Sequence, residues 1–250
     1  MIEINDLCVM AGKKEILNNI TLSVPRGKFT AILGKHGSGK STLISCIASS
    51  IRYSGSIKLD GRLISKIPPR TRARLISVLP QHLTSTDLTV RELVSLGRSA
   101  YTGITARLSS NDEEMITRAL AVTDMTDLAD IAVAKLSGGE RQSAFIAMTI
   151  AQDANVMIFD EPTTYMDAKR AFAVSDLLLS FVKSDNKTVV AVMHDINRAL
   201  TMADNVVVLE GGKVIFSGSP GQCKDLGIPT EHFGLTRIED IQGREFFIHP

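Results

Sequence analysis

One stretch near the N-terminus decides the fold of this chain: Phe29-Thr-Ala-Ile-Leu33-Gly34-Lys-His-Gly-Ser-Gly-Lys40-Ser41-Thr42-Leu-Ile-Ser-Cys-Ile-Ala48. Residues 29–33 are almost continuously apolar, which is typical of a strand buried on both faces. Residues 34–41 fit the pattern G-x-x-x-x-G-K-[ST] at every defined position. Residues 42–48 continue as a helical pattern. A buried strand, a glycine-rich loop and a helix in this order predict an α/β fold with a phosphate-binding loop.

Each residue type in this loop suits phosphate binding. Glycines let the backbone turn tightly and bring successive N–H groups close to phosphate oxygens, and the helix N-terminus adds about half a positive charge. Lys40 is expected to reach the β- and γ-phosphates, and the Ser41 hydroxyl to hold Mg²⁺. His36 is expected to supply only its backbone N–H. The predicted nucleotide-binding residues here are Gly34, Lys35, His36, Gly37, Ser38, Gly39, Lys40, Ser41 and Thr42.

A second apolar run, residues 156–159, ends in the acids Asp160 and Glu161. In open α/β sheets, ligands bind beyond the carboxyl ends of the strands, which is where both acids fall. Asp160 is therefore a candidate for the Mg²⁺ shell, and Glu161 for orienting or deprotonating an attacking water. Taken alone, such a pair is commonly a solvated turn. Together with the phosphate loop, it predicts the second half of a nucleoside triphosphate site.

The segment Leu136-Ser-Gly-Gly-Glu140 has two interpretations. Ser137 and Glu140 have the spacing of a capping box that starts a helix. However, two glycines at a helix start cost stability, roughly 1 kcal/mol each in a helix interior. Bare backbone is more useful where it must approach an anion. One ATP is not easily surrounded by two glycine-rich anion sites of one chain, so the segment also suggests that two chains meet.

Apolar runs at 75–79, 189–193 and 206–209 alternate with helical patterns, which predicts βα units and a mainly parallel sheet. Short β segments are predicted at 2–5, 20–24 and 56–59. Helices are predicted between about 83 and 136, with capping boxes at Thr89–Glu92 and Ser110–Glu113. The apolar side of the second of these helices is expected to carry Met115, Ala119 and Val122. A later helix is expected to begin after Asp167.

Composition excludes several classes of protein. A hydrophobic share of 44% and a charged share of 22% exclude a disordered chain, and a net charge of +1 argues against nucleic acid as a partner. No apolar run approaches the roughly 18–20 residues of a membrane span, and polar residues interrupt any signal peptide, so we expect a soluble, intracellular chain. The three cysteines contain no C-x-x-C pair and are expected to be small apolar residues.

The three motifs at 34–41, 136–140 and 160–161, in this order and spacing, closely resemble those of the ATP-binding-cassette (ABC) ATPases. The resemblance implies an α/β fold with a P-loop NTPase core, a mainly parallel sheet, an N-terminal antiparallel β subdomain and an inserted helical subdomain. It further implies a single domain over 1–250. Its core would comprise about 1–80 and 141–220, its helical insertion about 83–140, and its tail 221–250.

The resemblance also assigns roles to individual residues. It implies a head-to-tail dimer, in which each ATP lies between one chain's phosphate loop and the partner's Ser137, Gly138 and Gly139, followed by Glu140. Gln81 resembles the glutamine that senses Mg²⁺, and His194 resembles the histidine that contacts the γ-phosphate. Asp167 resembles the dimer-contacting aspartate. The implied catalytic residues are Glu161, His194, Gln81 and Lys40, and the implied Mg²⁺ ligands are Ser41, Gln81 and Asp160.

One position departs from the family. An aromatic residue that stacks on adenine usually lies near position 11, where this sequence has Ala11. Base–aromatic stacking is typically worth about 1–3 kcal/mol. We therefore expect weaker or less base-selective nucleotide binding than in relatives with the aromatic residue.

Finer resemblance points to importers of iron–siderophore complexes, haem or vitamin B12. It rests on the phrases at 80–82, 89–98, 161–165 and 193–197. A chain of 250 residues with one cassette implies a separate membrane permease, an extracytoplasmic substrate-binding protein and a peripheral location at the cytoplasmic face of the membrane. The alternatives are a soluble ATP-dependent switch in DNA repair, translation or regulation, and ATP binding without turnover. Near-neutral charge, the single cassette and the import-like phrases disfavour the switch. The presence of Lys40, Asp160, Glu161 and His194 disfavours ATP binding without turnover.

Overall fold

The predicted strand and helix around the glycine-rich loop form β3 (Phe29–Leu33) and α1 (Lys40–Ile47) in the computed structural model. The structure describes residues 1–81, 83–102 and 107–250. The chain divides into two units, the first made of Met1–Ser65 with Val190–Pro250 and the second of Lys66–Val189. The phosphate loop therefore belongs to the first unit, and the Asp160–Glu161 pair to the second.

The first unit contains a parallel strand pair. β3 pairs with β9 (Asn205–Glu210), and Leu33 lies opposite Val208. β10 (Lys213–Gly218) returns antiparallel beside β9. Every residue of β3 is buried, as expected for a strand covered on both faces. β8 (Thr188–Val192) is also buried throughout and crosses the division between the units.

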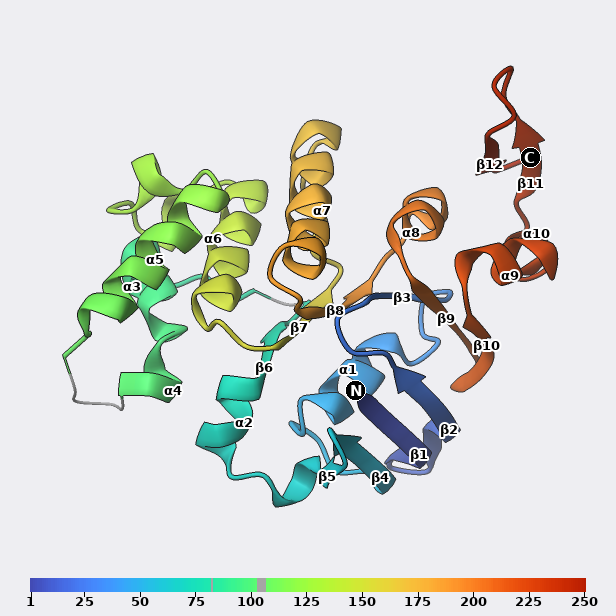
Figure 1. The fold of residues 1–250 in the computed structure, drawn as a ribbon, viewed down its shortest axis with the longest axis horizontal. Coiled ribbons are helices and arrows are strands. Elements are labelled where there is room, and N and C mark those ends of the chain that lie inside the picture. Colours follow the sequence, from blue (N-terminus) through green and yellow to red (C-terminus); the bar gives the residue numbers. More distant parts are fainter. Residues whose placement is uncertain (82, 103–106) are drawn as a thin grey trace. The chain divides into compact units, whose positions relative to one another are not determined.

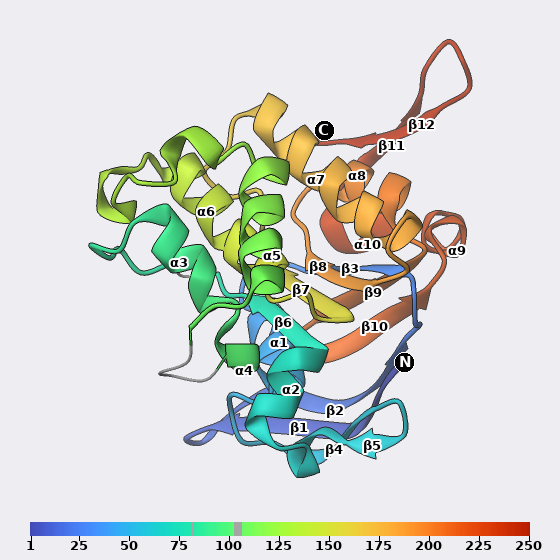
Figure 2. The same cartoon turned by 60° about the vertical axis from the view of Figure 1, so that its left-hand side comes forward.

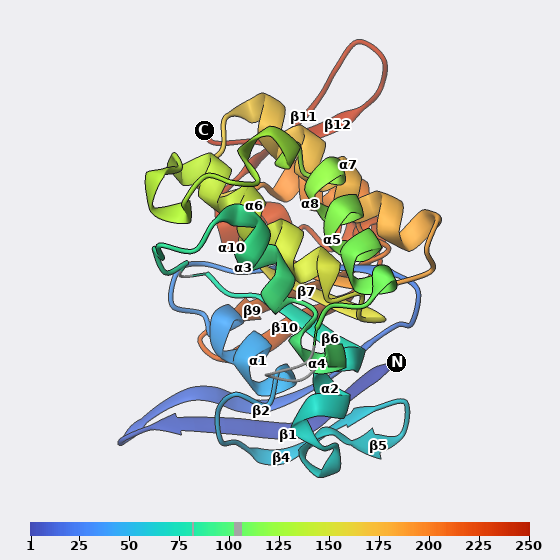
Figure 3. The ribbon, with the colours of Figure 1, turned by 90° about the vertical axis from the view of Figure 1, so that its left-hand side faces the viewer.

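An antiparallel sheet completes the N-terminal part of the first unit. Its order is β2-β1-β4-β5, and its strands are β1 (Ile2–Ala11), β2 (Lys14–Val24), β4 (Ser54–Leu59) and β5 (Arg62–Leu63). Helix α1 lies between this sheet and the layer of β3, β9 and β10 (Figures 1 and 3). The β segments predicted at 2–5, 20–24 and 56–59 all fall within these longer strands.

The first unit ends in elements that the sequence pattern did not resolve: helices α8 (Ile196–Met202), α9 (Pro220–Asp225) and α10 (Ile228–Phe233), and a hairpin of β11 (Thr236–Glu239) and β12 (Glu245–Ile248). Asn197 on α8 fixes the hairpin with two hydrogen bonds. Its amide donates to the Phe247 carbonyl (2.8 Å) and accepts from the Phe247 N–H (2.7 Å). The Phe247 side chain is buried.

The second unit pairs β6 (Ile76–Leu79) in parallel with β7 (Val156–Asp160). Helices α3, α5 and α6 pack against one another in this unit (Figure 2). Its helices are α2 (Pro69–Leu75), α3 (Val90–Leu96), α4 (Ser99–Thr102), α5 (Ser110–Val122), α6 (Gly138–Ala151) and α7 (Ala168–Lys183), with short 3₁₀ turns at Thr126–Leu128 and Val133–Lys135. A further 3₁₀ turn, Ile64–Lys66, crosses the division.

One predicted capping box is wrong by one residue. The box at the start of α5 is formed by Ser109 and Asp112, not by Ser110 and Glu113. The reason is tertiary, because the buried Arg98 donates to the Asp112 carboxylate (2.8 Å) and so fixes which acid lies at the third helical position. The buried side of α5 shifts accordingly: it carries Ile116, Ala119 and Leu120, whereas Met115 is half-buried and Val122 is exposed.

The predicted fold class is confirmed. Parallel strand pairs, an antiparallel β sheet and a run of helices between β6 and β7 are all present. The boxes at Thr89–Glu92 and Ser137–Glu140 form as predicted, and the Asp167 side chain caps α7. Among residues 1–81, 83–102 and 107–250, no helix is long and apolar enough to cross a bilayer.

Candidate active site

In the first unit, the loop at 34–41 is built around a tight turn. The Ser38 N–H donates to the Lys35 carbonyl (3.2 Å), and Gly37, at the third position of this turn, has a φ of 75°. These features match a type II turn, whose third residue needs a positive φ. The Lys40 ammonium donates to the Gly34 and Lys35 carbonyls (2.8 and 3.1 Å). The lysine side chain therefore crosslinks the loop backbone, and its positive charge lies within the curve of the loop.

Gly34 is required by close packing. A Cβ atom at this position would lie 2.4 Å from the Leu209 carbonyl oxygen and 2.5 Å from the Ser38 hydroxyl oxygen. The first of these atoms belongs to the backbone of β9, which pairs with β3. Since the obstructing group is main chain, it cannot move aside as a flexible side chain would. The loop thus leaves β3 along a path that only glycine permits.

The start of α1 has the character of an anion site. Its N-cap residue, Gly39, makes no side-chain capping bond, and the first turn carries no acidic residue. The buried hydroxyl oxygen of Ser38 has no hydrogen-bond partner among the described residues. A helix N-terminus without a cap, a buried hydroxyl and the Lys40 ammonium are the groups that a phosphate oxygen would satisfy. The residues of this half-site therefore fit a nucleotide phosphate.

His194 follows β8 and lies next to the phosphate loop in the first unit. The preceding Met193 donates its N–H to the Ile32 carbonyl of β3 (3.1 Å), and the following Asp195 caps α8 by accepting from the Arg198 N–H (3.0 Å). The ring of His194 stacks with that of His36, with centroids 6.0 Å apart. The structure thus brings together His194 and the loop that the sequence predicted to bind the γ-phosphate.

Ala11 lies at the exposed end of β1, beside the exposed Met10 and opposite Lys14. No aromatic side chain lies among residues 9–14 of this β1–β2 turn.

In the second unit, Gln81, Asp160 and Glu161 lie at the same edge of the β6–β7 pair. Leu79 lies opposite Phe159, so the chain leaves both parallel strands at the same level. Asp160 and Glu161 are 3% and 9% exposed, which places both acids inside rather than on a solvated turn. The alternative of a surface Asp-Glu turn is therefore excluded.

Glu161 has an unusual backbone. Its φ is +54°, in the left-handed region that costs a non-glycine residue about 1–3 kcal/mol. The surrounding structure holds it there: its carbonyl accepts from the Gln142 amide (3.4 Å) and the Thr164 N–H (3.2 Å), and its carboxylate accepts from the Thr164 hydroxyl (3.5 Å). Such strain clusters at active sites, because it aims a side chain that a relaxed turn would not.

The segment at 136–140 opens α6. The Ser137 hydroxyl and N–H both contact the Glu140 carboxylate (2.7 and 3.0 Å), and these hydrogen bonds hold the pKa of Glu140 below its usual range. Arg170 on α7 lies 3.8 Å from the same carboxylate. With Glu140 held in its capping role, Gly138 and Gly139 form an N-terminal turn of the helix without side chains, in which Gly138 is exposed and Gly139 is buried.

Tyr165 and Arg170 border this N-terminus. A Cβ on Gly138 would lie 3.2 Å from the Tyr165 Cβ, and one on Gly139 would lie 3.2 Å from the Tyr165 carbonyl oxygen. Tyr165 itself is 77% exposed and has a positive φ of 66°. The turn 161–167 therefore runs directly beside the two glycines and ends at Asp167, whose side chain accepts from the Arg170 N–H (2.8 Å).

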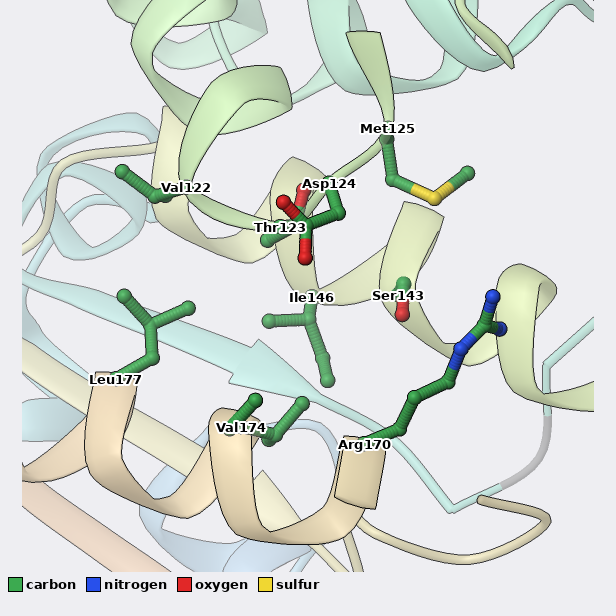
Figure 4. Close-up of a pocket in the computed structure, with 10 residues that line it drawn as sticks. Val122, Thr123, Asp124, Met125, Ser143, Ile146, Arg170, Val174 and Leu177 are labelled. Carbon is green, nitrogen blue, oxygen red and sulfur yellow. The ribbon is translucent and has the colours of Figure 1, made fainter. Parts of the chain in front are cut away.

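Arg170 also lines a pocket of about 110 Å³ between α5, α6 and α7. Arg170 and Ser143 lie at one end of it, and Val122 and Leu177 at the other (Figure 4). Its lining is partly apolar and contains none of the predicted nucleotide-binding residues. The predicted binding groups lie instead on the loop and the helix termini.

Several of these residues were not singled out from the sequence. Gln142, Tyr165 and Arg170 were missed because each acts through a tertiary contact that no local pattern encodes. The side chain of His36 was given no role, since the loop pattern leaves that position open. His82, part of the predicted phrase at 80–82, lies outside the described residues.

Comparison with known proteins agrees with this geometry. The ABC transporter family model matches residues 17–164. The petrobactin import ATP-binding protein FpuD of Bacillus anthracis is 38% identical over 226 residues, covering 90% of this chain and 83% of that protein. The ferric enterobactin transport ATP-binding protein FepC of Escherichia coli K12 is 37% identical, with the same coverage.

Solved structures show the same likeness. The dimeric structure of MJ0796, a bacterial ABC transporter cassette, aligns with a TM-score of 0.80 at 26% identity and covers 88% of this chain and 99% of that one. A dimeric post-hydrolysis state of MJ0796 bound to ADP and Pi aligns with a TM-score of 0.79 at 25% identity, with the same coverage.

Proposed function

The chain belongs to the ABC transporter family, and we propose that it is the ATP-hydrolysing subunit of an importer for iron chelates. The observation that carries this proposal is the phosphate loop of the first unit. Its helix start without a side-chain cap, its enclosed Lys40 ammonium and the Ser38 hydroxyl, which has no hydrogen-bond partner among the described residues, are groups that a nucleotide phosphate satisfies together. The backbone N–H groups of residues 34–42 would bind the phosphates, and Lys40 would contact the β- and γ-phosphates.

Mg²⁺ would be held by oxygen donors, which are the ligands that this ion prefers. The donors are the Ser41 hydroxyl, the Asp160 carboxylate and the Gln81 side chain. Their chemistry fits the ion, and the burial of Asp160 supports a ligand role over that of a surface charge. When bound, Mg²⁺ neutralises charge that develops on the phosphate oxygens.

Hydrolysis would use Glu161 and His194. The strained backbone of Glu161 fixes its carboxylate at the end of β7, where it would orient the attacking water and accept its proton. His194 would contact the γ-phosphate, and Gln81 would sense the ion. Lys40 would stabilise the charge of the transferred group.

The active species would be a head-to-tail dimer. The bare helix start of Ser137, Gly138 and Gly139, with Glu140 holding the cap, would bind the ATP of a second copy of this chain, and Asp167 would contact that copy. The backbone N–H groups at a helix N-terminus form such an anion site. The dimeric structures of the related cassette MJ0796 support this assembly.

Transport requires partners that carry the membrane path. We propose a separate permease, an extracytoplasmic substrate-binding protein and a peripheral position at the cytoplasmic face of the membrane. The helical insertion at about 83–140 would face the permease, and the tail at 221–250 would complete the single domain. The substrate class rests on relatives that import petrobactin and transport ferric enterobactin.

The test of hydrolysis is a steady-state ATPase assay on the purified chain with and without Mg²⁺. Glu161→Gln should lower kcat about 10²- to 10⁴-fold, the usual contribution of a general base, while ATP still binds. The exposed Glu114→Gln on α5 is the matched control and should hydrolyse ATP like the wild type. Undiminished hydrolysis by Glu161→Gln would refute the role of Glu161.

The test of the substrate is uptake by the reconstituted importer. The chain is co-expressed with its permease and binding protein, and uptake of radioactive iron is measured with ferric siderophores, haem and free Fe³⁺ in parallel. Uptake of a ferric siderophore that stops with Glu161→Gln supports the proposal. A complex that hydrolyses ATP but transports none of the chelates contradicts the substrate class alone.

A further inference from the structure

Two histidine rings face each other beside the phosphate loop. The rings of His36 and His194 are stacked, with centroids 6.0 Å apart and an interplanar angle of 21°. Both side chains are exposed, and both belong to the first unit. This separation lies within the range of 4.5–7 Å over which offset aromatic pairs attract each other.

The backbone fixes the position of each ring's attachment point. His36 occupies the second position of the turn that the Ser38-to-Lys35 hydrogen bond closes. The Lys40 ammonium also donates to the Lys35 carbonyl of this turn. The backbone on either side of His194 is fixed: the Met193 N–H hydrogen-bonds to β3, and the Asp195 side chain caps α8. The stacked arrangement restricts the rotation of both side chains.

The restriction matters because His194 is exposed. Exposed side chains change rotamer on a picosecond to nanosecond timescale, and each contact that a ring makes narrows the range of its orientations. A group that must contact the transferred phosphoryl in the transition state works best when it is already oriented. His36 supplies an aromatic face that would contribute to orienting the His194 ring before ATP binds.

We infer that His36 is a positioning residue, which stacks on the imidazole of His194 and holds it for catalysis. The contact itself stands on the structure, and its catalytic consequence rests on the proposed ATPase function. The inference adds a side-chain role at a loop position that the G-x-x-x-x-G-K-[ST] pattern leaves open, where only a backbone contribution was expected. His36 is argued to act through His194, not on the nucleotide.

The kinetic test compares His36→Ala with His36→Phe. The alanine variant loses the stack, and kcat should fall about three- to tenfold, as expected from the strength of one aromatic pair, while KM for ATP stays within about twofold. The phenylalanine variant keeps an aromatic face and should recover most of the lost kcat. In a His194→Ala background, His36→Ala should cause no further loss.

Three kinetic outcomes would overturn the inference. A phenylalanine variant as slow as the alanine variant would show that a polar contact of the His36 ring matters. A raised KM with unchanged kcat would make His36 a nucleotide-binding side chain. Additive losses in the double variant would separate the two histidines.

A measurement without ATP separates this inference from the proposed function. In carbon–proton correlation NMR spectra of the ring Cε1–H groups, His36→Ala should move the His194 signal, because the ring current of its neighbour is lost. His249→Ala, which removes an exposed histidine near the C-terminus, is the control and should leave that signal in place. An unmoved His194 signal refutes the stack whatever the ATPase result. A wild-type chain that hydrolyses no ATP refutes the proposed function while the NMR result still decides the stack.

Discussion

At the scale of single residues, close packing sets the sharpest constraint at Gly34. Alanine there would place its Cβ 2.4 Å from the Leu209 carbonyl oxygen, closer than real Cβ atoms come. We expect Gly34→Ala to weaken nucleotide binding at least about tenfold, since displacing the loop misaligns its N–H groups, and each 1.4 kcal/mol is a factor of ten. Titration with a fluorescent ATP analogue measures the loss.

The control for this prediction is Gly61→Ala. Gly61 also has a positive φ (78°), but a Cβ there meets nothing within 4 Å. It therefore reports the cost of backbone strain alone and should bind the analogue like the wild type. Equal binding by Gly34→Ala and the wild type would show that the backbone of β9 shifts to accommodate the new Cβ and that this contact does not fix the loop.

The residue scale is also where the sequence is most and least informative. The roles of Lys40 and Gly34 follow from a motif whose spacing encodes the loop. The positive φ of Glu161 and the partner of His36 do not, because both depend on tertiary contacts made by residues distant in sequence. A sequence motif identifies residues whose function depends on local backbone structure. The orientation of a side chain depends on the residues that pack around it.

At the scale of elements, the buried pair Arg98–Asp112 joins α5 to the end of α3. Arg98 also donates to the Ala151 carbonyl at the end of α6 (2.7 Å), so one guanidinium links three helices. The pKa of Asp112 is lowered, first by the hydrogen bond from the Ser109 hydroxyl, then by the Ser109 N–H and by Arg98. The carboxylate is thus stabilised in its charged form by the folded state.

This pair predicts a pH-dependent stability. Because the pKa is lower in the folded state, the stabilisation is complete above the unfolded value of about 3.9 and is lost as the pH falls through the folded value. Asp112→Asn should lower the free energy of unfolding by about 3–5 kcal/mol at pH 7, since it leaves Arg98 buried without its counter-charge. Urea unfolding followed by circular dichroism measures the difference.

The difference between wild type and Asp112→Asn should shrink below about pH 4, where the Asp112 carboxyl of the unfolded chain begins to protonate while that of the folded chain stays charged. The exposed Glu114→Gln on the same helix serves as the control and should unfold at the wild-type urea concentration. A difference that is constant from pH 7 to pH 3 would mean that shape, not charge, is what Asp112 contributes.

Most, but not all, of the helices and strands could be predicted from the sequence. Strands β3, β7 and β9 were evident as apolar runs, and the helix starts at Thr89, Ser137 and Asp167 as capping residues. The start of α5 was misplaced by one residue because two overlapping Ser–acid spacings compete, and Arg98 selects the first. Strands β10, β11 and β12 were missed because they are only four to six residues long and show neither a continuously apolar sequence nor a regular two-residue alternation.

At the scale of the whole molecule, the near-neutral charge of +1 does not prevent anion binding, because the binding groups are local. In the proposed site, backbone N–H groups at two helix starts and one lysine would supply them. The start of α1 belongs to the first unit and that of α6 to the second. If the dimer is head-to-tail, each ATP uses the loop of one copy and the α6 start of the other.

This arrangement predicts rescue between two inactive variants. Lys40→Met disables the loop, and Gly138→Asp places a negative charge at the α6 start, where the new Cβ would lie 3.2 Å from the Tyr165 Cβ and requires a shift of a few tenths of an ångström. Each variant alone should be inactive. In an equimolar mixture, half of the dimers are mixed, and each mixed dimer has one site with both parts intact, so about a quarter of the wild-type activity should return. An ATPase assay on the mixture measures it. The double variant Lys40→Met/Gly138→Asp mixed with the Lys40→Met variant is the control and should stay inactive, since none of its dimers contains an intact phosphate loop. A mixture of the single variants as inactive as either one alone would place both parts of the site within one chain.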